Sequence, residues 1–473
     1  MSRTAATTSQ VRAYRFMLRR MESALVGRDA VMRREPMRQH LRATAVGLVL
    51  SVLGLAAFFV VGRFRPVSDL NPDDIVIARP SQAVFVVRDN PRRLVPVPNL
   101  TSARLLLLAL ASGQQQPAVK TVEEAALAGI PRTQATGIPA APPLPAPENL
   151  IHPVWSVCDS TADPVVTQPT TTVLIQQRPP AARGLGEEAA LLVAEQRTRA
   201  TYLVWQGHRS RIDLADPAIR TLYRLGNVVP RPVGSGLLNA IPEGHPLVLP
   251  AIPVGLPFPQ LPGRQVGDVV RVEGAQDSFF LLLPQGVQPI EPAVADLIRY
   301  HHSTSPEVPT ITPEALARVP EAPLAAQLDF AGFPHRVPRV LGAADIPVVC
   351  LTWLGPDRPA LITTAPDGRL PVVAGESPVE LSGSGGGRTA DAVYLTPTKA
   401  ALVHEVQPGQ RPDASTLWLV TDQGFRYPVP SAQVAAALGL GAASTPAPGP
   451  ILELLPVGPA LDPQRAVAAI SGN

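Results

Sequence analysis

The sequence predicts an α+β protein with a single membrane pass and an elongated extracytoplasmic region of four β-β-β-α-α repeats around a disulfide-stapled central β core. Three observations lead to this prediction: an uncharged segment of 20 residues, a phrase that recurs in the same context, and two cysteines. The 473 residues suffice for several domains, and 56 prolines favour short elements joined by stiff connectors.

The uncharged segment is ATAVGLVLSVLGLAAFFVVG, residues 43–62. As a helix it would span roughly 30 Å, the thickness of a bilayer core. A signal peptide is the alternative, but the segment starts too late, is too long, and is followed by arginines instead of a small-residue cleavage site. We therefore expect a transmembrane helix over 43–62.

Charge is distributed unevenly on the two sides of this segment. Residues 1–42 contain ten arginines against Glu22, Asp29 and Glu35, whereas acidic residues are in slight excess after position 42. Arginine-rich flanks stay in the cytoplasm. The expected location is the plasma (inner) membrane, with a cytoplasmic N-terminus and residues 63–473 extracytoplasmic, or periplasmic. This distribution does not indicate a nucleic-acid-binding protein.

The Arg-rich head also has a helical pattern. Apolar residues recur at steps of three and four, which predicts an amphipathic helix with an Arg-rich opposite face. Such a helix can rest on anionic lipid or dock against cytoplasmic or membrane partners, and the pattern leaves both open. We take partner docking as the working hypothesis for the apolar stripe of this helix. Its residues are Val11, Tyr14, Leu18, Met21 and Leu25.

The recurring phrase is LLNAIPEGHPL (237–247), which returns as ILELLPVGPAL (451–461). Three strand-like runs and a helix signal precede both copies, and two further copies have the same order. A helix usually ends before proline, so the phrase indicates the end of a short second helix. A β-β-β-α-α unit is therefore expected four times. The phrases are Leu127-x-x-Ile130-Pro131, Leu238-x-x-Ile241-Pro242, Leu316-x-x-Val319-Pro320 and Leu452-x-x-Leu455-Pro456.

The strands of the copies are rich in β-branched and aromatic residues. They are expected at 75–78, 83–87, 94–97, then 190–194, 201–205, 211–214, then 268–272, 278–283, 287–290, then 401–406, 415–420, 426–429. Good capping residues open the helices. Asn99, Asp216, Glu291 and Ser431 open the first helices, and Thr121 and Thr312 open second helices. Asn99 also begins the glycosylation sequon Asn99-Leu100-Thr101, but capping is the better interpretation.

Other β runs lie between the copies. WSVCDS (155–160) and TTVLI (171–175) follow the first copy, and PVVCLTW (347–353), ALITT (360–364) and DAVYL (391–395) follow the third. We interpret them as two halves of one central sheet in a pseudo-twofold molecule. In an oxidising compartment two cysteines form one disulfide by default, here Cys158–Cys350, with two buried thiols as the alternative.

These elements divide the chain into eight regions. Residues 1–42 are the cytoplasmic amphipathic helix and 43–62 the transmembrane helix. The others are repeat 1 (63–138), the first half of the core (139–186), repeat 2 (187–262), repeat 3 (263–338), the second half of the core (339–397), and repeat 4 with the tail (398–473).

Catalytic patterns are missing from the sequence. It has no P-loop and no Gly-x-Ser-x-Gly elbow, and His404-Glu405 lacks the second histidine of a zinc-protease motif. The pair His301-His302 is better explained as a solvated loop pair than as a metal site, and GSGGGR (383–388) as a flexible loop than as a phosphate cradle. We therefore expect no catalytic residue, no cofactor and no metal.

Several longer stretches are distinctive when taken together. The head contains QVRAYRFMLRRMESAL with GRDAVM (10–32), followed by one membrane helix. Further stretches are PVPNLTSARLLL (96–107), TGIP (136–139), WSVCD (155–159), Cys350 near Trp353, and GFRYPVP with ALGL (424–440). In these stretches the chain resembles the EccB family, a core membrane component of the type VII (ESX) secretion system.

The resemblance implies a subunit that contributes the extracytoplasmic part of the secretion complex, and the missing catalytic patterns favour a non-catalytic structural role in its assembly. It implies as partners a motor ATPase, a multi-pass channel subunit, a small membrane subunit and a mycosin protease, together with self-association outside the membrane. Members of the family are often labelled ATPases. An ATP-hydrolysing subunit is therefore one alternative, and a cell-wall-binding or cell-wall-hydrolysing protein is another.

Overall fold

The structure, a computed structural model, describes residues 7–27, 36–63, 70–110, 117–161, 168–179, 183–186, 188–274, 278–302, 307–365, 367–382, 388–407, 416–441 and 443–470. The chain divides into two units, Met1–Leu70 and Asn71–Asn473. Each unit is described by itself.

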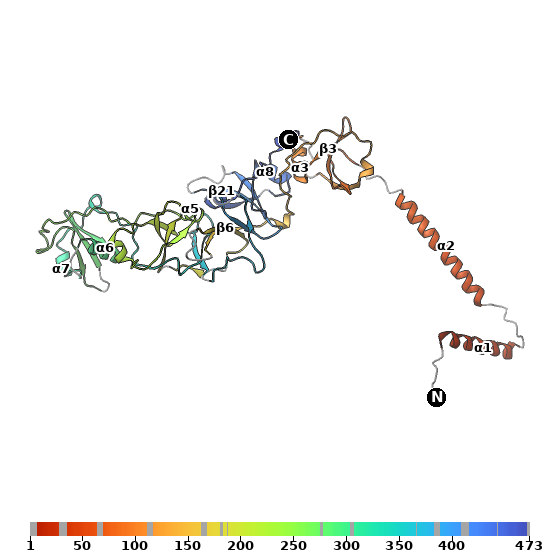
Figure 1. Cartoon of the computed structure of the whole chain (residues 1–473), viewed down its shortest axis with the longest axis horizontal. Helices are drawn as coiled ribbons and strands as arrows, with labels where there is room; N and C mark the ends of the chain where they lie inside the picture. Colours follow the sequence, from red (N-terminus) through yellow and green to blue (C-terminus); the bar gives the residue numbers. More distant parts are fainter. Residues whose placement is uncertain are drawn as a thin grey trace. The chain divides into compact units, whose positions relative to one another are not determined.

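The first unit consists of two helices, α1 (Thr8–Gly27) and α2 (Pro36–Arg63) (Figure 1). Within α2, residues His40–Phe59 have a mean hydropathy of 1.9, and none of them is buried. Among the described helices, α2 alone is long and apolar enough to cross a membrane. The predicted helix over 43–62 is therefore present as part of a longer one.

The second unit is a mixed α+β structure in which four sheets share one strand order. In each, the first strand is central and pairs antiparallel with the second strand and parallel with the fourth. Sheet 1 has β1 (Ile75–Arg79), β2 (Val84–Arg88), β3 (Arg93–Val97) and β4 (Val119–Glu123); sheet 2 has β8 (Ala189–Glu195), β9 (Thr201–Trp205), β10 (His208–Arg211) and β11 (Arg231–Val233). Sheet 3 has β12 (Val269–Val272), β13 (Ser278–Leu283), β14 (Gly286–Ile290) and β15 (Thr310–Ile311); sheet 4 has β21 (Ala400–Val406), β22 (Leu417–Thr421), β23 (Arg426–Val429) and β24 (Thr445–Pro448).

Two helices accompany each sheet, one on either side of the fourth strand in the sequence. The first helices are α3 (Leu100–Ala109), α4 (Pro217–Leu222), α6 (Pro292–His302) and α8 (Ala432–Ala437), and the second are η1 (Glu124–Leu127, a 3₁₀ helix), α5 (Ser235–Ala240), α7 (Pro313–Leu316) and α9 (Gly449–Leu452). Asn99 and Ser431 are N-caps, because their side chains accept hydrogen bonds from the amides of Ser102 and Val434.

The element order is therefore β-β-β-α-β-α, and the expected β-β-β-α-α order is incomplete. The fourth strands, which the prediction did not include, are two to five residues long, and β11 and β24 contain proline. They have no alternating pattern of their own and depend on pairing with the distant first strand. Thr121 lies in β4 and does not cap η1, whose N-cap Glu123 makes no side-chain bond. The third strand of sheet 2 is also displaced, to 208–211 from the expected 211–214.

The recurring phrase makes the same two backbone hydrogen bonds in every copy. The amide of Arg209 donates to the Pro242 carbonyl (2.9 Å), and the amide of Gly244 donates to the Arg209 carbonyl (2.9 Å). Equivalent pairs join Arg426 to Pro456 and Gly458, Leu94 to Pro131 and Thr133, and Val287 to Pro320 and Ala322. The phrase thus ends the second helix and then fastens the chain to the third strand of its sheet.

The central sheet interlocks the two halves of the second unit. Its strand order is β19-β20-β6-β5-β17-β18-β7. β7 belongs to the first half of the core but pairs with β18 of the second half. Conversely, β20 belongs to the second half but pairs with β6 of the first. Cys158 and Cys350 lie opposite each other on β5 and β17 and form a disulfide. The bounds are β5 (Val154–Ser160), β6 (Thr170–Gln176), β7 (Arg183–Gly184), β17 (Val348–Trp353), β18 (Leu361–Ala365), β19 (Val379–Glu380) and β20 (Ala392–Leu395).

Three apolar cores connect these sheets. Sheets 1 and 4 share one core, in which α3 packs against α8 and α10 (Pro463–Val467); α3 and α8 are far apart in the sequence but side by side in Figure 1. Sheets 2 and 3 share another through α4 and α6. The third core lies under the central sheet, where α5 and α9 cover Trp155. The remaining elements are η2 (Pro147–Asn149), η3 (Leu324–Ala326) and β16 (Arg339–Leu341), which pairs with β8.

Candidate functional site

The apolar stripe of α1 is a candidate docking surface. Its residues Val11, Tyr14, Leu18, Met21 and Leu25 have 39, 65, 48, 56 and 82% of their surface exposed. No part of the described first unit covers them, so their burial requires a surface outside this unit. Such a stripe offers apolar area to lipid or to another protein and offers no catalytic chemistry.

A buried polar network lies beside the disulfide, where the central sheet meets sheet 2. The carboxylate of Asp159 accepts hydrogen bonds from the Thr171 hydroxyl (2.7 Å) and from the Gly234 amide (2.7 Å). Arg231 is 1% exposed and donates to the backbone carbonyls of Asp159 (2.8 Å) and Ile346 (2.9 Å). These bonds tie α5 and β11 to both halves of the core.

Burial raises the pKa of Asp159 to about 6, against the opposing effects of its hydrogen bonds and of the Arg231 charge. A β carbon on residue 234 would lie 2.6 Å from the Thr171 hydroxyl oxygen, so the close approach of this segment to the carboxylate requires glycine. The sequence analysis missed this network. The available signal was an acidic residue directly after Cys158 in a strand that the sequence predicts to lie in the core.

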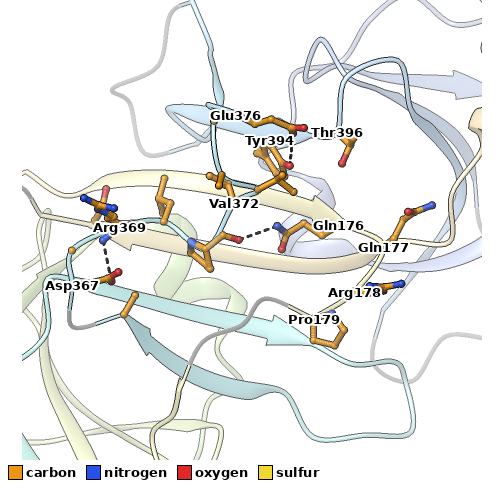
Figure 2. Close-up of a pocket in the computed structure, with 18 residues that line it drawn as sticks. Gln176, Gln177, Arg178, Pro179, Asp367, Arg369, Val372, Glu376, Tyr394 and Thr396 are labelled. Carbon is orange, nitrogen blue, oxygen red and sulfur yellow. Dashed lines mark hydrogen bonds between the residues drawn. The ribbon is translucent and has the colours of Figure 1, made fainter.

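A hollow of about 1110 Å³ lies on the same face of the central sheet as the disulfide. Residues 367–376 cross this face, and Leu370 and Val372 pack against the cluster that contains Cys158 and Cys350. Figure 2 shows two of the polar contacts that hold the crossing: Gln176 donates to the Pro371 carbonyl (2.9 Å), and the Tyr394 hydroxyl donates to Glu376 (2.6 Å). Burial raises the pKa of Tyr394, which disfavours a phenolate nucleophile. These contacts cover the disulfide and do not assemble a reacting pair.

The histidine motifs lie in separate places. His301 and His302 are exposed at the end of α6, which corrects the expected loop, and His404 on β21 hydrogen-bonds with the Ser444 hydroxyl (2.9 Å). No group of three or more metal-ligating side chains occurs among the residues that the structure describes. Most of GSGGGR, residues 383–387, lies outside the described residues.

These observations define the class of protein: a chain with one candidate membrane-spanning helix, joined to a large disulfide-linked α+β region of sheets with a common strand order. The chain belongs to the EccB family of type VII secretion, because the family model described as "Type VII secretion system ESX-1, transport TM domain B" matches residues 3–472.

Similar proteins cover nearly the whole chain. The "ESX-3 secretion system ATPase EccB3" of Mycolicibacterium smegmatis is 33% identical over 98% of this chain and 90% of its own length. A chain in the structure of an intact ESX-5 inner membrane complex is 28% identical, with a TM-score of 0.72 over 100% of this chain and 97% of that one. A chain in the structure of an EccB3 dimer from the ESX-3 core complex is 30% identical, with a TM-score of 0.68 over 84% of this chain and 100% of that one.

Proposed function

We propose that this chain is a non-catalytic structural subunit of a type VII (ESX) inner-membrane complex and that its second unit takes part in the periplasmic assembly. The observation that carries the proposal is the likeness to the intact ESX-5 inner membrane complex, which extends over all of this chain, helices and sheets together. Likeness over the full length favours the same mode of incorporation, with one end in the membrane and the other in an assembly outside it.

The orientation in this proposal places α1 in the cytoplasm and the second unit in the periplasm. Ten arginines precede the apolar span, whereas Arg63 and Arg65 follow it closely. A reporter active only in the cytoplasm should work when fused before residue 43, and a periplasm-only reporter should work at residue 473. The opposite pattern would overturn the orientation.

The architecture in this proposal is four copies of one repeat around the disulfide-linked core, divided at the boundaries expected from the sequence. Four sheets of one strand order and the four equivalent proline contacts support common units. The interlocked central sheet and the Cys158–Cys350 bond would hold the two halves together while other subunits attach.

Specific contacts complete the proposal. The exposed stripe of α1 would dock against a cytoplasmic or membrane partner, with the motor ATPase, the multi-pass channel subunit, the small membrane subunit and the mycosin protease as the candidate subunits. Self-association outside the membrane is supported by the solved dimer of a related chain.

Purification of the affinity-tagged full chain from its own host in mild detergent tests the proposal. We expect the other subunits of the secretion complex to co-purify in fixed ratios and to give one large particle. Recovery of the chain alone, with secretion unaffected by its deletion, would contradict the proposed function.

ATP hydrolysis is the second candidate, favoured by the names of relatives such as the ESX-3 ATPase EccB3. A nucleotide site usually needs a lysine on the phosphates. The two lysines of this chain have other partners: Lys120 pairs with Asp74 (2.7 Å), and Lys399 donates to Asn149 (2.9 Å). Phosphate-release assays on the purified chain should show no turnover, and turnover that falls in a point variant of this chain would establish the alternative.

A further inference from the structure

A second hollow, of about 540 Å³, lies where α5 of sheet 2 meets α9 of sheet 4. Its walls combine polar side chains, such as Asn239, with apolar side chains, such as Leu454. α5 packs closely here against the residues that directly follow α9, since a β carbon on Gly236 would lie 3.1 Å from the Leu454 side chain. The floor of the hollow is therefore a firm contact between two sheets that are far apart in the sequence.

Three arginines from three segments line this hollow. Arg197 comes from the turn between β8 and β9, Arg388 from the loop before β20, and Arg426 from β23, whereas Glu453 is the one carboxylate of the lining. Within the described parts of the chain, neither Arg197 nor Arg388 has an ion-pair partner. Neighbouring like charges repel one another, and an anion in the hollow would relieve this repulsion.

Carboxylates also lie near this hollow. Glu195, two residues before Arg197, accepts hydrogen bonds from the hydroxyls of Ser235 (2.9 Å) and Thr198. Glu405, which accepts from the side-chain amide of Gln407 (2.8 Å), and Glu453 both favour the charged form of Arg426 electrostatically. The charge of Arg426 is therefore partly balanced, whereas Arg197 and Arg388 make no ion pair within the described parts of the chain.

Arg426 is held in place for binding. Its Nε donates to the Leu455 carbonyl (3.2 Å), and its guanidinium carbon lies 4.4 Å from the centroid of the Trp418 ring. Its terminal nitrogens make no hydrogen bond to the residues that the structure describes. A guanidinium fixed in this way loses little freedom when it binds a carboxylate with both terminal nitrogens.

We propose that this hollow binds an acidic peptide segment of another subunit of the membrane complex, with its carboxylates on Arg197, Arg388 and Arg426. The inference rests on the proposed function, since it requires a partner subunit. A peptide fits better than a free oxyanion, because the volume exceeds the need of one oxyanion and Leu454 and Pro450 offer apolar contacts between charges. Charge complementarity would also select the partner.

The test compares two double variants of the tagged full chain in its own host. Arg197→Glu with Arg388→Glu reverses the charge of the hollow without removing a described contact. Arg220→Glu with Arg358→Glu makes the same change in charge at exposed positions outside the lining. The first pair should lower recovery of one partner subunit about tenfold or more, since like-charge juxtaposition costs several kcal/mol, whereas the second pair should not. Both should keep the thermal midpoint of the wild-type chain.

A photo-crosslinker at position 239 of the otherwise wild-type chain identifies the occupant. We expect a crosslink to an acidic segment of that same partner, and conversion of its carboxylates to lysine should restore recovery of the first double variant. Normal recovery of all subunits with the first variant, or crosslinks confined to copies of this chain, would overturn the inference.

Two further outcomes separate this inference from neighbouring ones. If inorganic phosphate raises the thermal midpoint of the wild-type chain only, while subunit recovery is unchanged in the variant, the hollow is an oxyanion site and the peptide inference is wrong. If the wild-type chain itself brings no subunits, the proposed function fails, and the inference fails with it.

Discussion

The two units of the chain treat apolar side chains in opposite ways. In α1, Leu25 is 82% exposed and Leu18 is 48% exposed, and α2 is exposed throughout its apolar span. In the second unit, leucines of helices such as α3 and α5, for example Leu105 and Leu237, are 0% exposed. The second unit therefore buries its own core, whereas the first unit needs surroundings that it does not itself supply.

This difference separates two uses of the hydrophobic effect. Burial stabilises by about 25 cal/mol per Å² of apolar surface, whether the surface meets its own chain, lipid or a partner. Substitutions in the core of the second unit should change its free energy of unfolding. Substitutions in the stripe of α1 should change assembly or membrane contact and leave that free energy unchanged. Four predictions test this separation.

Loss of the disulfide should have the largest effect on stability. Cys158 and Cys350 are 0% and 1% exposed and are 192 residues apart, and a loop of this length is worth at most about 5 kcal/mol in the chain-entropy model. Cys158→Ser should lower the thermal midpoint and make Cys350 reactive to thiol reagents, and the double serine variant controls for the free thiol. Free thiols in freshly purified wild-type protein would contradict the prediction.

The pH dependence of stability should come next in size. Burial raises the pKa of Asp159 from 3.8 to about 6. Between these two pH values the folded chain therefore keeps a proton that the unfolded chain releases. This contribution is fully present below pH 3.8 and is lost as the pH rises through 6, at about 1.4 kcal/mol per pKa unit and ~3 kcal/mol in all.

Asp159→Asn should remove this pH dependence, because an amide does not titrate in this range. The variant should still fold, since the amide can accept from the Gly234 amide and donate to the Thr171 hydroxyl oxygen. Denaturant titrations of both proteins between pH 4 and 7 measure it as a difference in slope. Asp367→Asn, in the loop that crosses the disulfide face, is the control. Parallel curves for wild type and Asp159→Asn would refute the assigned role.

The N-cap of α3 should contribute less to the stability of the second unit than the disulfide or Asp159 does. The Asn99 side chain accepts from the Ser102 amide (2.8 Å) at the start of α3, and replacement of such a cap by alanine costs about 1 kcal/mol. Asn99→Ala should lower the midpoint of the second unit, and Asn99→Asp, which keeps the acceptor, should lower it less. Equal losses in both variants would assign the effect to the hydrogen bonds that the side-chain amide donates to the carbonyls of Ile138 (3.0 Å) and Pro139 (3.4 Å).

Substitution in α1 should have the smallest effect on unfolding and a large effect on assembly. Leu18→Asp places a charge on the apolar stripe, and Phe16→Asp places one off it. Neither should move the midpoint of the second unit, but Leu18→Asp should release the chain from its partners. Normal co-purification of Leu18→Asp, with lower affinity for anionic vesicles, would favour the lipid-bound interpretation instead.

Local sequence signals located most elements of the second unit. Asp216 and Pro217 mark the start of α4, and Ser431 and Gly439 mark the two ends of α8. Capping and the left-handed conformation of the glycine depend only on neighbouring residues. The same kind of signal failed at Thr121. Thr121 is followed three residues later by Glu124, which matches the capping-box pattern, but pairing of β4 with β1 keeps the backbone extended.

The α1 stripe could be predicted from apolar spacing, but the hollow between α5 and α9 could not. The hollow draws on Arg197, Arg388 and Arg426, which no motif in their own segments singles out. Their significance comes from the packing of sheets 2 and 4 against one core, and no spacing in the sequence records that packing.

The sequence by itself determined the apolar span, the common order of the first three strands, and the pair of cysteines, because each depends on composition or on contacts between near neighbours. Only the tertiary structure decided the fourth strands, the exchange of β7 and β20 between halves, and the pairing of sheet 1 with sheet 4 and of sheet 2 with sheet 3. The physical reason is that a parallel strand of two to five residues gains its stability from a partner far along the chain. Its own residues therefore carry little trace of the pairing.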